Sequence, residues 1–512
     1  MAAMDRLDDI PRHWAAQRGD AIVLRDEAGP RTWAALDDAR ESLATQLADL
    51  GVRAGDRVVI VGENCAQMVA LLFALASVDA WIVNLNARLT AREVDAIRAH
   101  AGARCMLFLP DNSPDAATHA ARHGARPLAG CGWGSLLRSD LDLQCRPEPV
   151  EGPRGERVAA LVYTTGTTGD PKGVMLTHAN VLFVARAAGQ LRALTPADRA
   201  LGVLPLSHVY GLSSMCVGTL LSGAALHLQP RFTPAGLERA LTEERVTLCQ
   251  GVPAMYAKYL EHLASHRRAF SGPSLRAIYC GGSPLAASVK RDVEATFGLT
   301  LHNGYGLTEA APTVTQTRHD APRADCSVGP ALPGEQLRLV GPDGADVKAG
   351  DVGELWVHGP NIMRGYYRDP RATAAALRAG GWLATGDLAR IDPDGAVHIE
   401  GRLKELIIRS GFNVFPVEVE AVLNAHPDVS QSAVVGREVE GNEEVVAFVE
   451  PAPGAAVDPE ALLAFAAASL APYKRPCEVI VLEKLPAAAS GKILKARLKE
   501  MARASARPAP VG

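Results

Sequence analysis

The stretch Tyr163–His178 reads "YTTGTTGDPKGVMLTH" and concentrates threonine and glycine around a single lysine. The strand-like "VAALVYTT" leads into it, and a strand followed by a helix with Thr177 as N-cap is expected to come after it. A glycine-rich turn lets backbone N–H groups approach an anion, and threonine hydroxyls and a lysine add donors. We therefore predict a phosphate-binding loop rather than a solvated polar turn, although the spacing differs from G-x-x-x-x-G-K-[ST].

Strand and helix signals alternate on both sides of this loop. Short apolar runs such as "RVVIVG" (57–62) and "WIVNLN" (81–86) are each followed by a helical pattern, which predicts parallel βαβ units. After about Ala331 the pattern changes to polar–apolar alternation interrupted by P-D-G, which is typical of antiparallel hairpins. The predicted fold class is α/β: a large body of several βαβ layers, a small β-barrel-like section at 331–401, and a smaller α+β domain. The expected domain boundaries are 1–402 and 403–512.

Composition limits the classes of partner. A chain of 512 residues is too long for one hydrophobic core, and 53 Lys and Arg against 57 Asp and Glu leave no basic field for a nucleic acid. Nine scattered cysteines without a C-x-x-C pair indicate reduced thiols in a cytoplasmic protein. We expect no signal peptide and no membrane span, since the longest apolar runs are shorter than the roughly 18 residues required.

Four further stretches follow the glycine-rich loop in a fixed order. They are "NGYGLTE" (Asn303–Glu309), "WLATGDLARIDPDG" (Trp382–Gly395), "GRLKELIIRSGFNVFPVEVE" (Gly401–Glu420) and "PAAASGKILKARL" (Pro486–Leu498). Together with "YTTGTTGDPKGV" they resemble the core motifs of the adenylate-forming superfamily, and the resemblance covers nearly the whole chain. Departures are mild, such as "YTTG" for the commoner Y-T-S-G and Ala489 where threonine often stands.

The resemblance implies a two-step ligase that uses ATP, Mg²⁺ and coenzyme A. A carboxylic acid first reacts with ATP to give an acyl-adenylate and pyrophosphate, and the acyl group then passes to the thiol of CoA. The implied catalytic residues are Lys492, which bridges the attacking carboxylate and the phosphate end of the nucleotide, Glu309 as the Mg²⁺ ligand, Thr308 at the α-phosphate, and His208. For His208 we favour a gate at the carboxylate and tunnel mouth over a general base. A general base must first lie within hydrogen-bond reach of the proton that it takes, and only then does its pKa matter.

The resemblance also implies the nucleotide site. Tyr305 is expected against adenine, Asp387 on the ribose hydroxyls, and Arg402 in the ribose and phosphate region. The complete implied set is Thr164, Thr165, Gly166, Thr167, Thr168, Gly169, Lys172, Gly281, Gly282, Asn303, Gly304, Tyr305, Gly306, Asp387 and Arg402.

The second step is implied to use a mobile C-terminal domain that turns about a hinge at Lys404. Gly411 is expected to line the thiol tunnel. Tyr473, Lys474 and Arg475 of "APYKRP" are expected to meet CoA, the ring by stacking and the cations by pairing with phosphate. A solvated basic turn is the alternative for that stretch.

The implied acyl pocket is lined by His208, Tyr210, Gly281, Gly304, Pro312 and Thr313. Two glycines leave room, no tryptophan closes the pocket, and no second cation stands at these positions for a dicarboxylate. We therefore expect a monocarboxylic acid larger than acetate, and both aromatic and medium- to long-chain fatty acids stay open.

Two other functions compete with a CoA ligase. One is an adenylating enzyme that loads a carrier protein or stops at the acyl-adenylate, and the other is a nucleotide-binding sensor without turnover. No carrier domain follows the small domain, which favours free CoA, and the presence of Lys492, Glu309 and Asp387 together speaks against a sensor. A monomer and a homodimer are both compatible with the sequence.

Overall fold

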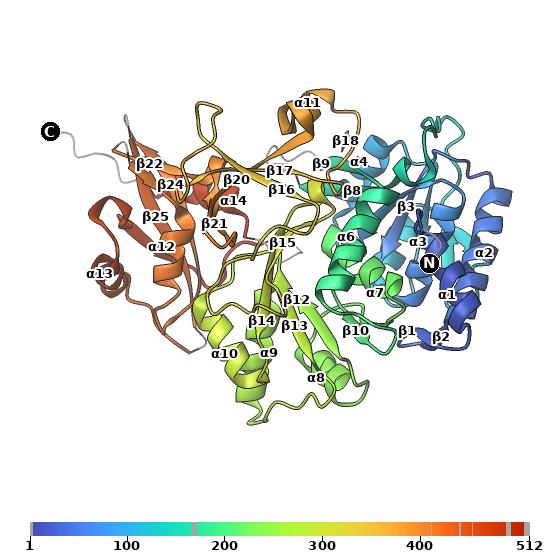
Figure 1. The fold of residues 1–512 in the computed structure, drawn as a ribbon, viewed down its shortest axis with the longest axis horizontal. Helices are drawn as coiled ribbons and strands as arrows, with labels where there is room; N and C mark the ends of the chain where they lie inside the picture. The colour runs from blue at the N-terminus through green and yellow to red at the C-terminus, as the bar shows by residue number, and fades with distance from the viewer. Residues whose placement is uncertain are drawn as a thin grey trace.

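The computed structural model describes residues 4–165, 171–410, 412–439, 442–452, 454–487 and 493–505. Its N-terminal body is built on two large sheets that lie side by side (Figure 1). The first sheet has the strand order β15-β14-β13-β12-β10-β11-β1-β2. Its strands are β1 (Ile22–Asp26), β2 (Gly29–Thr32), β10 (Arg199–Gly202), β11 (Ala225–Leu228), β12 (Leu248–Gly251), β13 (Ala277–Gly281), β14 (Leu301–Gly306) and β15 (Thr313–Gln316).

The second sheet has the order β18-β9-β8-β4-β3-β5-β7-β6. Its strands are β3 (Arg57–Gly62), β4 (Trp81–Asn86), β5 (Cys105–Phe108), β6 (Arg126–Leu128), β7 (Leu136–Arg138), β8 (Val158–Thr165), β9 (Pro171–Thr177) and β18 (Gly365–Tyr366). The central strands of each sheet pair in parallel. The pairs β1–β2, β8–β9 and β14–β15 are antiparallel. The βαβ alternation predicted from the sequence is confirmed.

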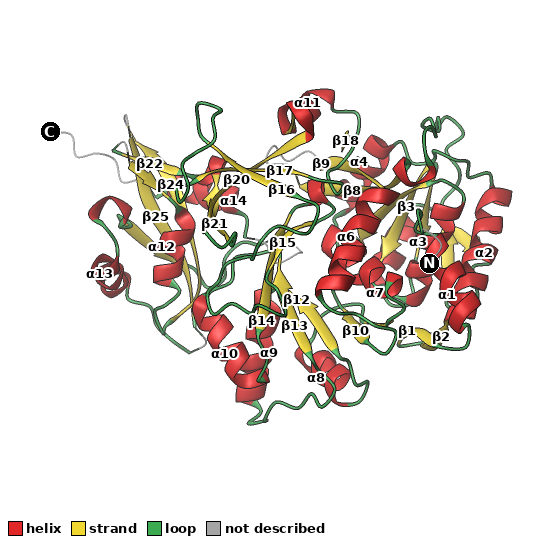
Figure 2. Cartoon of the chain, viewed as in Figure 1, coloured by secondary structure: helices red, strands yellow, loops and turns green. Residues whose placement is uncertain are grey.

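Helices cover both sheets (Figure 2). They are α1 (Asp9–Arg18), α2 (Trp33–Leu50), α3 (Ala66–Ser77), α4 (Ala91–Ala101), α5 (Pro114–Arg122), α6 (His178–Leu191), α7 (Gly218–Leu221), α8 (Pro234–Thr242), α9 (Pro253–Ser265) and α10 (Ala287–Phe297). Helix α6 begins as predicted: the Thr177 side chain accepts from the Asn180 N–H, and the Asn180 side chain accepts in return from the Thr177 N–H.

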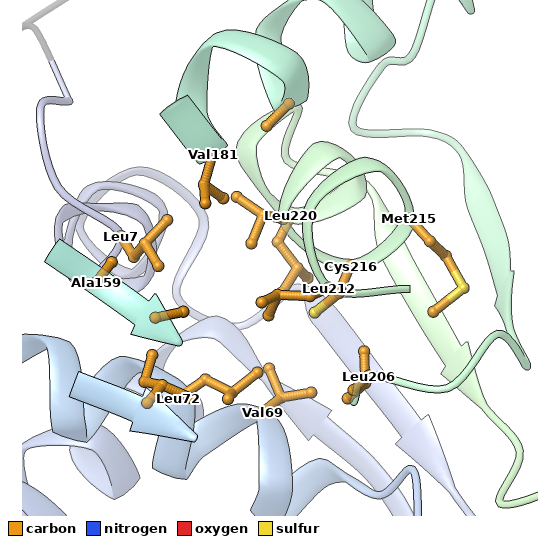
Figure 3. Packing of buried hydrophobic residues seen from close by; sticks show 14 of the residues in the cluster. Leu7, Val69, Leu72, Ala159, Val181, Leu206, Leu212, Met215, Cys216 and Leu220 are labelled. Carbon is orange, nitrogen blue, oxygen red and sulfur yellow. The ribbon is translucent and has the colours of Figure 1, made fainter. Parts of the chain in front are cut away.

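The main hydrophobic core joins the two sheets. Helix α3 is apolar on every side, and its residues from Ala66 to Ala76 are buried, because it lies between layers rather than on the surface. Its side chains share one buried cluster with side chains of α6 and of the π-helix η2 (Tyr210–Val217), as Figure 3 shows. The labelled side chains are Leu7, Val69, Leu72, Ala159, Val181, Leu206, Leu212, Met215, Cys216 and Leu220. This core fixes η2 beside the sheet that carries the predicted acyl pocket.

The predicted β-rich section is an antiparallel sheet with the order β16-β17-β20-β19, in which β21 also pairs with β20. Its elements are β16 (Gln336–Val340), β17 (Gly353–His358), α11 (Pro370–Ala376), β19 (Leu377–Arg378), β20 (Trp382–Ile391) and β21 (Val397–Arg402). The hairpin read from "IDPDGAVHIEGR" is the β20–β21 pair.

The C-terminal part has its own buried clusters and lies at the end of the molecule opposite the N-terminus (Figure 1). A β22–β23 hairpin leads to a sheet of order β24-β25-β26 with helices packed against it. The elements are β22 (Ile407–Arg409), β23 (Phe412–Val414), α12 (Pro416–Leu423), β24 (Val429–Val439), β25 (Asn442–Pro451), α13 (Pro459–Ser469), β26 (Glu478–Val481) and α14 (Lys495–Ala504). The α+β class predicted for this part is confirmed.

Candidate active site

Asp387, Arg402 and Tyr305 meet where the β-rich section touches the first sheet. Asp387 on β20 is directly opposite Arg402 on β21, and the Arg402 Nε lies 2.9 Å from Oδ1 of Asp387. The Tyr305 hydroxyl, at the end of β14, donates to Oδ2 of the same carboxylate. Burial, and after it the Asp387 charge, raises the pKa of Tyr305, which therefore stays a neutral donor. Three residues predicted for one nucleotide thus lie in direct contact.

Two glycines pair in the strands beside Tyr305, so no side chain projects from the backbone there. Gly281, the last residue of β13, pairs with Gly304 on β14, and Gly282 follows with a φ of +80°. The neighbouring Asn303 uses its side-chain amide to donate to the carbonyls of Cys326 and Ser327, at 3.1 and 3.3 Å. The Asn303 amide therefore ties the strand end to a loop.

A close backbone approach brings Pro312 and Thr313 to this place. A Cβ on Gly306 would stand 2.2 Å from the Pro312 carbonyl oxygen, so only glycine fits there. The Leu307 N–H donates to the same oxygen at 3.0 Å. Thr313 begins β15 and is buried.

Glu309 is connected to the phosphate-loop hairpin through Tyr366, a residue that the sequence reasoning missed. Glu309 lies in the short 3₁₀ turn Thr308–Ala310, and its Oε1 accepts a hydrogen bond of 2.7 Å from the Tyr366 hydroxyl. The Lys172 Nζ stands 5.2 Å from the centroid of the Tyr366 ring, within cation–π range. A signal for Tyr366 was present, since "RGYYRDP" contains two adjacent aromatic residues before a helix start.

The glycine-rich loop itself connects β8 to β9. Thr164 pairs with Lys172, and Thr165 pairs with Pro171 at the loop end of this hairpin. The remaining predicted loop residues, Gly166, Thr167, Thr168 and Gly169, lie outside the described residues. Lys172 and Tyr366 connect this end of the hairpin to Glu309. The arrangement is consistent with a phosphate site between the loop and Glu309.

His208 and Tyr210 lie at the start of η2. His208 is exposed, and its Nδ1 accepts the Tyr210 backbone N–H at 3.2 Å. A neutral imidazole that accepts at Nδ1 carries its proton on Nε2, which is then a donor and not a base. The Tyr210 ring edge lies beside Gly281, since its Cε1 is 3.7 Å from where a Cβ on Gly281 would stand.

The predicted hinge lies in a short 3₁₀ turn, Leu403–Glu405, between β21 and β22, and Lys404 is exposed there. Glu405 forms an ion pair of 3.0 Å with Lys495, which also lies 2.8 Å from Glu420 on α12. Lys495 thereby ties the start of α14 to the hinge turn. The predicted catalytic Lys492 and the predicted tunnel residue Gly411 lie outside the described residues.

Three of the residues predicted to meet CoA, Tyr473, Lys474 and Arg475, lie at a short 3₁₀ turn of the C-terminal part. The Tyr473 ring stacks on Phe412 at a centroid distance of 4.6 Å, and the Phe412 side chain is 54% exposed although it is aromatic. Lys474 forms an ion pair of 2.6 Å with Glu418, and the Arg475 Nε donates to the Leu470 carbonyl at 2.9 Å. Both cations therefore have protein partners in this arrangement.

Comparisons with known proteins identify the class. The family model described as AMP-binding enzyme matches residues 11–367, and the model described as AMP-binding enzyme C-terminal domain matches residues 418–492. A feruloyl-CoA synthase from Amycolatopsis is 38% identical over 96% of this chain and 98% of its own length. An indoleacetate–CoA ligase from Aromatoleum aromaticum is 34% identical over 97% and 98%. The crystal structure of ATP-bound MatB from Rhodopseudomonas palustris superimposes with a TM-score of 0.83 at 30% identity, covering 97% of this chain and 99% of that one.

The chain therefore belongs to the AMP-binding enzyme family. Within it, the protein is an acid–thiol ligase that uses ATP and CoA, as the motif resemblance predicted. In the part of the chain that the structure describes, no helix is both long enough and apolar enough to cross a membrane.

Proposed function

We propose that this ligase activates an aromatic monocarboxylic acid and transfers it to CoA. The observation that carries the proposal is the pair Gly281–Gly304, which puts no side chain on the strand ends that lie beside the Tyr210 ring edge. A wall of bare backbone next to an aromatic ring suits a planar ring better than a bent alkyl chain. The printed names of two relatives, feruloyl-CoA synthase and indoleacetate–CoA ligase, describe acids with aromatic rings.

In the first step, a carboxylate oxygen of the acid attacks the α-phosphorus of ATP, and the bond to pyrophosphate breaks. Two anions must approach each other, so positioning and charge neutralisation dominate the barrier. We assign that task to Lys492 at the reacting oxygens and to Thr308 at the α-phosphate. The nucleoside is held by Tyr305 at the base and by Asp387 and Arg402 at the ribose.

Glu309 fits a role as Mg²⁺ ligand. Mg²⁺ is typically bound by one or two carboxylates together with substrate phosphates, and Glu309 supplies one carboxylate whose orientation Tyr366 fixes. In the described residues no group of three or more His, Cys, Asp or Glu side chains is arranged around one point. The ion would neutralise phosphate charge, and its remaining ligands would come from ATP and water.

In the second step, the CoA sulfur attacks the acyl carbonyl, and AMP leaves. We propose that residues 403–512 turn about Lys404 between the steps, so that Gly411 replaces Lys492 at the site. Phe412 and Tyr473 would then offer a stacking surface to CoA beside Lys474 and Arg475. His208 is proposed as a gate at the carboxylate and tunnel mouth, where it is exposed next to the start of η2.

We place the enzyme in the cytoplasm, because all nine cysteines, each within the described residues, are free. A fatty acid is the alternative substrate, and transfer to a carrier protein is the alternative second step.

The test is pyrophosphate release with ATP and Mg²⁺ across benzoate- and cinnamate-type acids and C8–C16 fatty acids, with and without CoA. We expect turnover with aromatic acids that depends on CoA. Turnover with fatty acids alone would contradict the proposed substrate. Turnover that does not depend on CoA would favour the alternatives that do not use free CoA. No pyrophosphate release with any acid would favour the nucleotide-binding sensor.

A further inference from the structure

The turn between β22 and β23 contains a residue in a strained backbone conformation. Arg409 pairs with Phe412 across the hairpin, so Ser410 is the first of the two residues that join the strands. Ser410 has a φ of +51°, in the left-handed region that residues other than glycine, asparagine and aspartate rarely adopt. A serine stays in this region only where neighbouring groups stabilise it.

Two side chains at the start of β25 supply this stabilisation. The Ser410 backbone N–H donates to Oδ1 of Asn442 at 2.6 Å, and the Asn442 amide donates in return to the Ser410 hydroxyl at 3.2 Å. The Ile408 N–H donates to Oε2 of Glu443 at 2.6 Å. Because Ile408 and Ser410 are alternate residues, their N–H groups point to the same edge of the hairpin. Asn442 and Glu443 therefore cap that edge.

The hairpin is also attached to the 3₁₀ turn Pro472–Lys474. The Arg409 Nη1 donates to the carbonyls of Tyr473 and Arg475 at 3.4 and 2.7 Å, and the Phe412 ring stacks on the Tyr473 ring. Figure 1 shows β22 in the C-terminal part, beside β24 and β25. All of these contacts join the hairpin to its own domain, so a turn of the domain would carry the hairpin as part of one rigid unit.

We propose that Asn442 is a positioning residue for the transfer of the acyl group to CoA. It holds Ser410 in the left-handed conformation and thereby sets the direction in which the tip of the β22–β23 hairpin points. Glu443 supports the same edge one turn of the strand pattern earlier. Small misplacements of groups that orient reactants lower the rate strongly, so a hairpin without this support should transfer the acyl group more slowly.

The inference rests on the proposed function, in which residues 403–512 turn so that Gly411 replaces Lys492 at the site. Lys492, the residue assigned to the first step, is on another segment of the chain and makes no use of the hairpin. Asn442 should therefore matter for the second step and not for the first. A residue that only stabilises the domain would affect both steps alike, which makes the two roles distinguishable.

Two assays separate the steps, with the acid that the enzyme turns over fastest. Single-turnover pyrophosphate release measures the first step, and thioester formation from supplied acyl-adenylate and CoA measures the second. We expect Asn442→Ala to lower kcat/KM for CoA in the second assay by about tenfold, while pyrophosphate release changes less than about twofold. Asn424→Ala, at the end of α12 in the same domain, is the matched control and should keep the wild-type ratio of the two rates.

A second substitution tests the physical cause. Glycine adopts a positive φ without strain, so Ser410→Gly needs less support from Asn442. We expect the double variant Asn442→Ala with Ser410→Gly to be at least about threefold faster in the second step than Asn442→Ala alone. Each rate is expressed relative to the first step of the same preparation, so that the comparison does not depend on the folded fraction.

An unchanged second step in Asn442→Ala, an equal loss of both steps, or a double variant no faster than Asn442→Ala would overturn the inference. If Asn442→Ala yields no folded protein, Glu443→Ala, which removes the acceptor of the Ile408 N–H, decides by the same ratio. Lys492→Ala in the same assays tests the function beneath the inference. Equal loss of both steps in that variant would overturn the proposed domain turn and this inference with it, whereas loss of the first step alone, beside an unchanged second step in Asn442→Ala, would overturn only the role of Asn442.

Discussion

The Tyr366 hydroxyl donates a 2.7 Å hydrogen bond to Glu309, while the Tyr366 ring lies beneath the ammonium group of Lys172. One side chain thereby holds the predicted metal ligand and the predicted phosphate-loop cation in a fixed relation. The two groups are 137 positions apart in the chain, and β18 brings them together by pairing with β9. We therefore infer that Tyr366 positions Glu309 and Lys172 for the adenylation step.

Tyr366→Phe keeps the ring and removes the donor. We expect about a tenfold lower kcat for pyrophosphate release and a higher Mg²⁺ requirement, because Glu309 loses the bond that orients it. The neighbouring Tyr367→Phe is the control, since the Tyr367 hydroxyl donates to Glu148 instead. An unchanged Mg²⁺ dependence in Tyr366→Phe would contradict the positioning role.

Asp387→Asn tests the ribose site. The amide removes the charge that faces Arg402 and one acceptor, so we expect KM for ATP to rise by roughly tenfold or more, with the KM for the acid little changed. Asp392→Asn, which changes an ion-paired carboxylate in the β20–β21 turn, serves as the control. An equal rise of both KM values would point to general misfolding of the site.

Lys492→Ala separates the two half-reactions. Adenylation should be lost, because no other cation is assigned to the attacking carboxylate, whereas thioester formation from supplied acyl-adenylate should be largely retained. Single-turnover assays of each half-reaction measure this, with the exposed Lys484→Ala as control. Equal loss of both steps would contradict a C-terminal domain that works in two orientations.

Gly304→Trp fills the space between the glycines. A side chain there starts 3.0 Å from the Thr315 carbonyl and must extend toward the pocket, so aromatic acids should be excluded while acetate or propionate is accepted relatively better. The ratio of kcat/KM for a cinnamate and for propionate should fall by at least about tenfold. An unchanged ratio would show that the acyl wall lies elsewhere.

Stability should depend on pH through His178. Burial lowers the pKa of His178 to about 3, and its Nδ1 accepts the Leu7 N–H, which requires the neutral ring. Between pH 6.5 and 3 the unfolded chain binds a proton that the folded one does not, so stability is lost as pH falls through this range, by up to about 1.4 kcal/mol per pH unit. His178→Gln should flatten this slope in denaturant unfolding, and the exposed His266→Gln should not. Identical slopes in wild type and His178→Gln would contradict this assignment.

Local patterns in the sequence were sufficient for many of the helices and strands, whereas the motif residues were assigned through the family resemblance. The hairpin around Lys172 and the Thr177 cap follow from turn and capping chemistry within about 20 residues of chain. The resemblance assigned Tyr305, Asp387 and Arg402 to one nucleotide but did not predict their direct contact, which joins β14 to a hairpin some 80 residues later.

Residues that act through distant packing could not be found in this way. Arg192 ends a helix and looks like an ordinary surface cation in the sequence, and only the placement of η2 and β15 around it makes it a buried charge. None of the predicted pocket positions is a cation. Arg192 is not one of these positions and lies one layer behind them. The contact of Phe412 with Tyr473 could likewise not be predicted, because it depends on where β23 places the Phe412 ring.

The most direct test of the account is the product analysis of one reaction containing enzyme, ATP, Mg²⁺, CoA and 4-hydroxycinnamate. We predict 4-hydroxycinnamoyl-CoA with one AMP and one pyrophosphate for each thioester formed. Formation of ADP, or pyrophosphate release without any thioester, would contradict an AMP-forming aryl–CoA ligase.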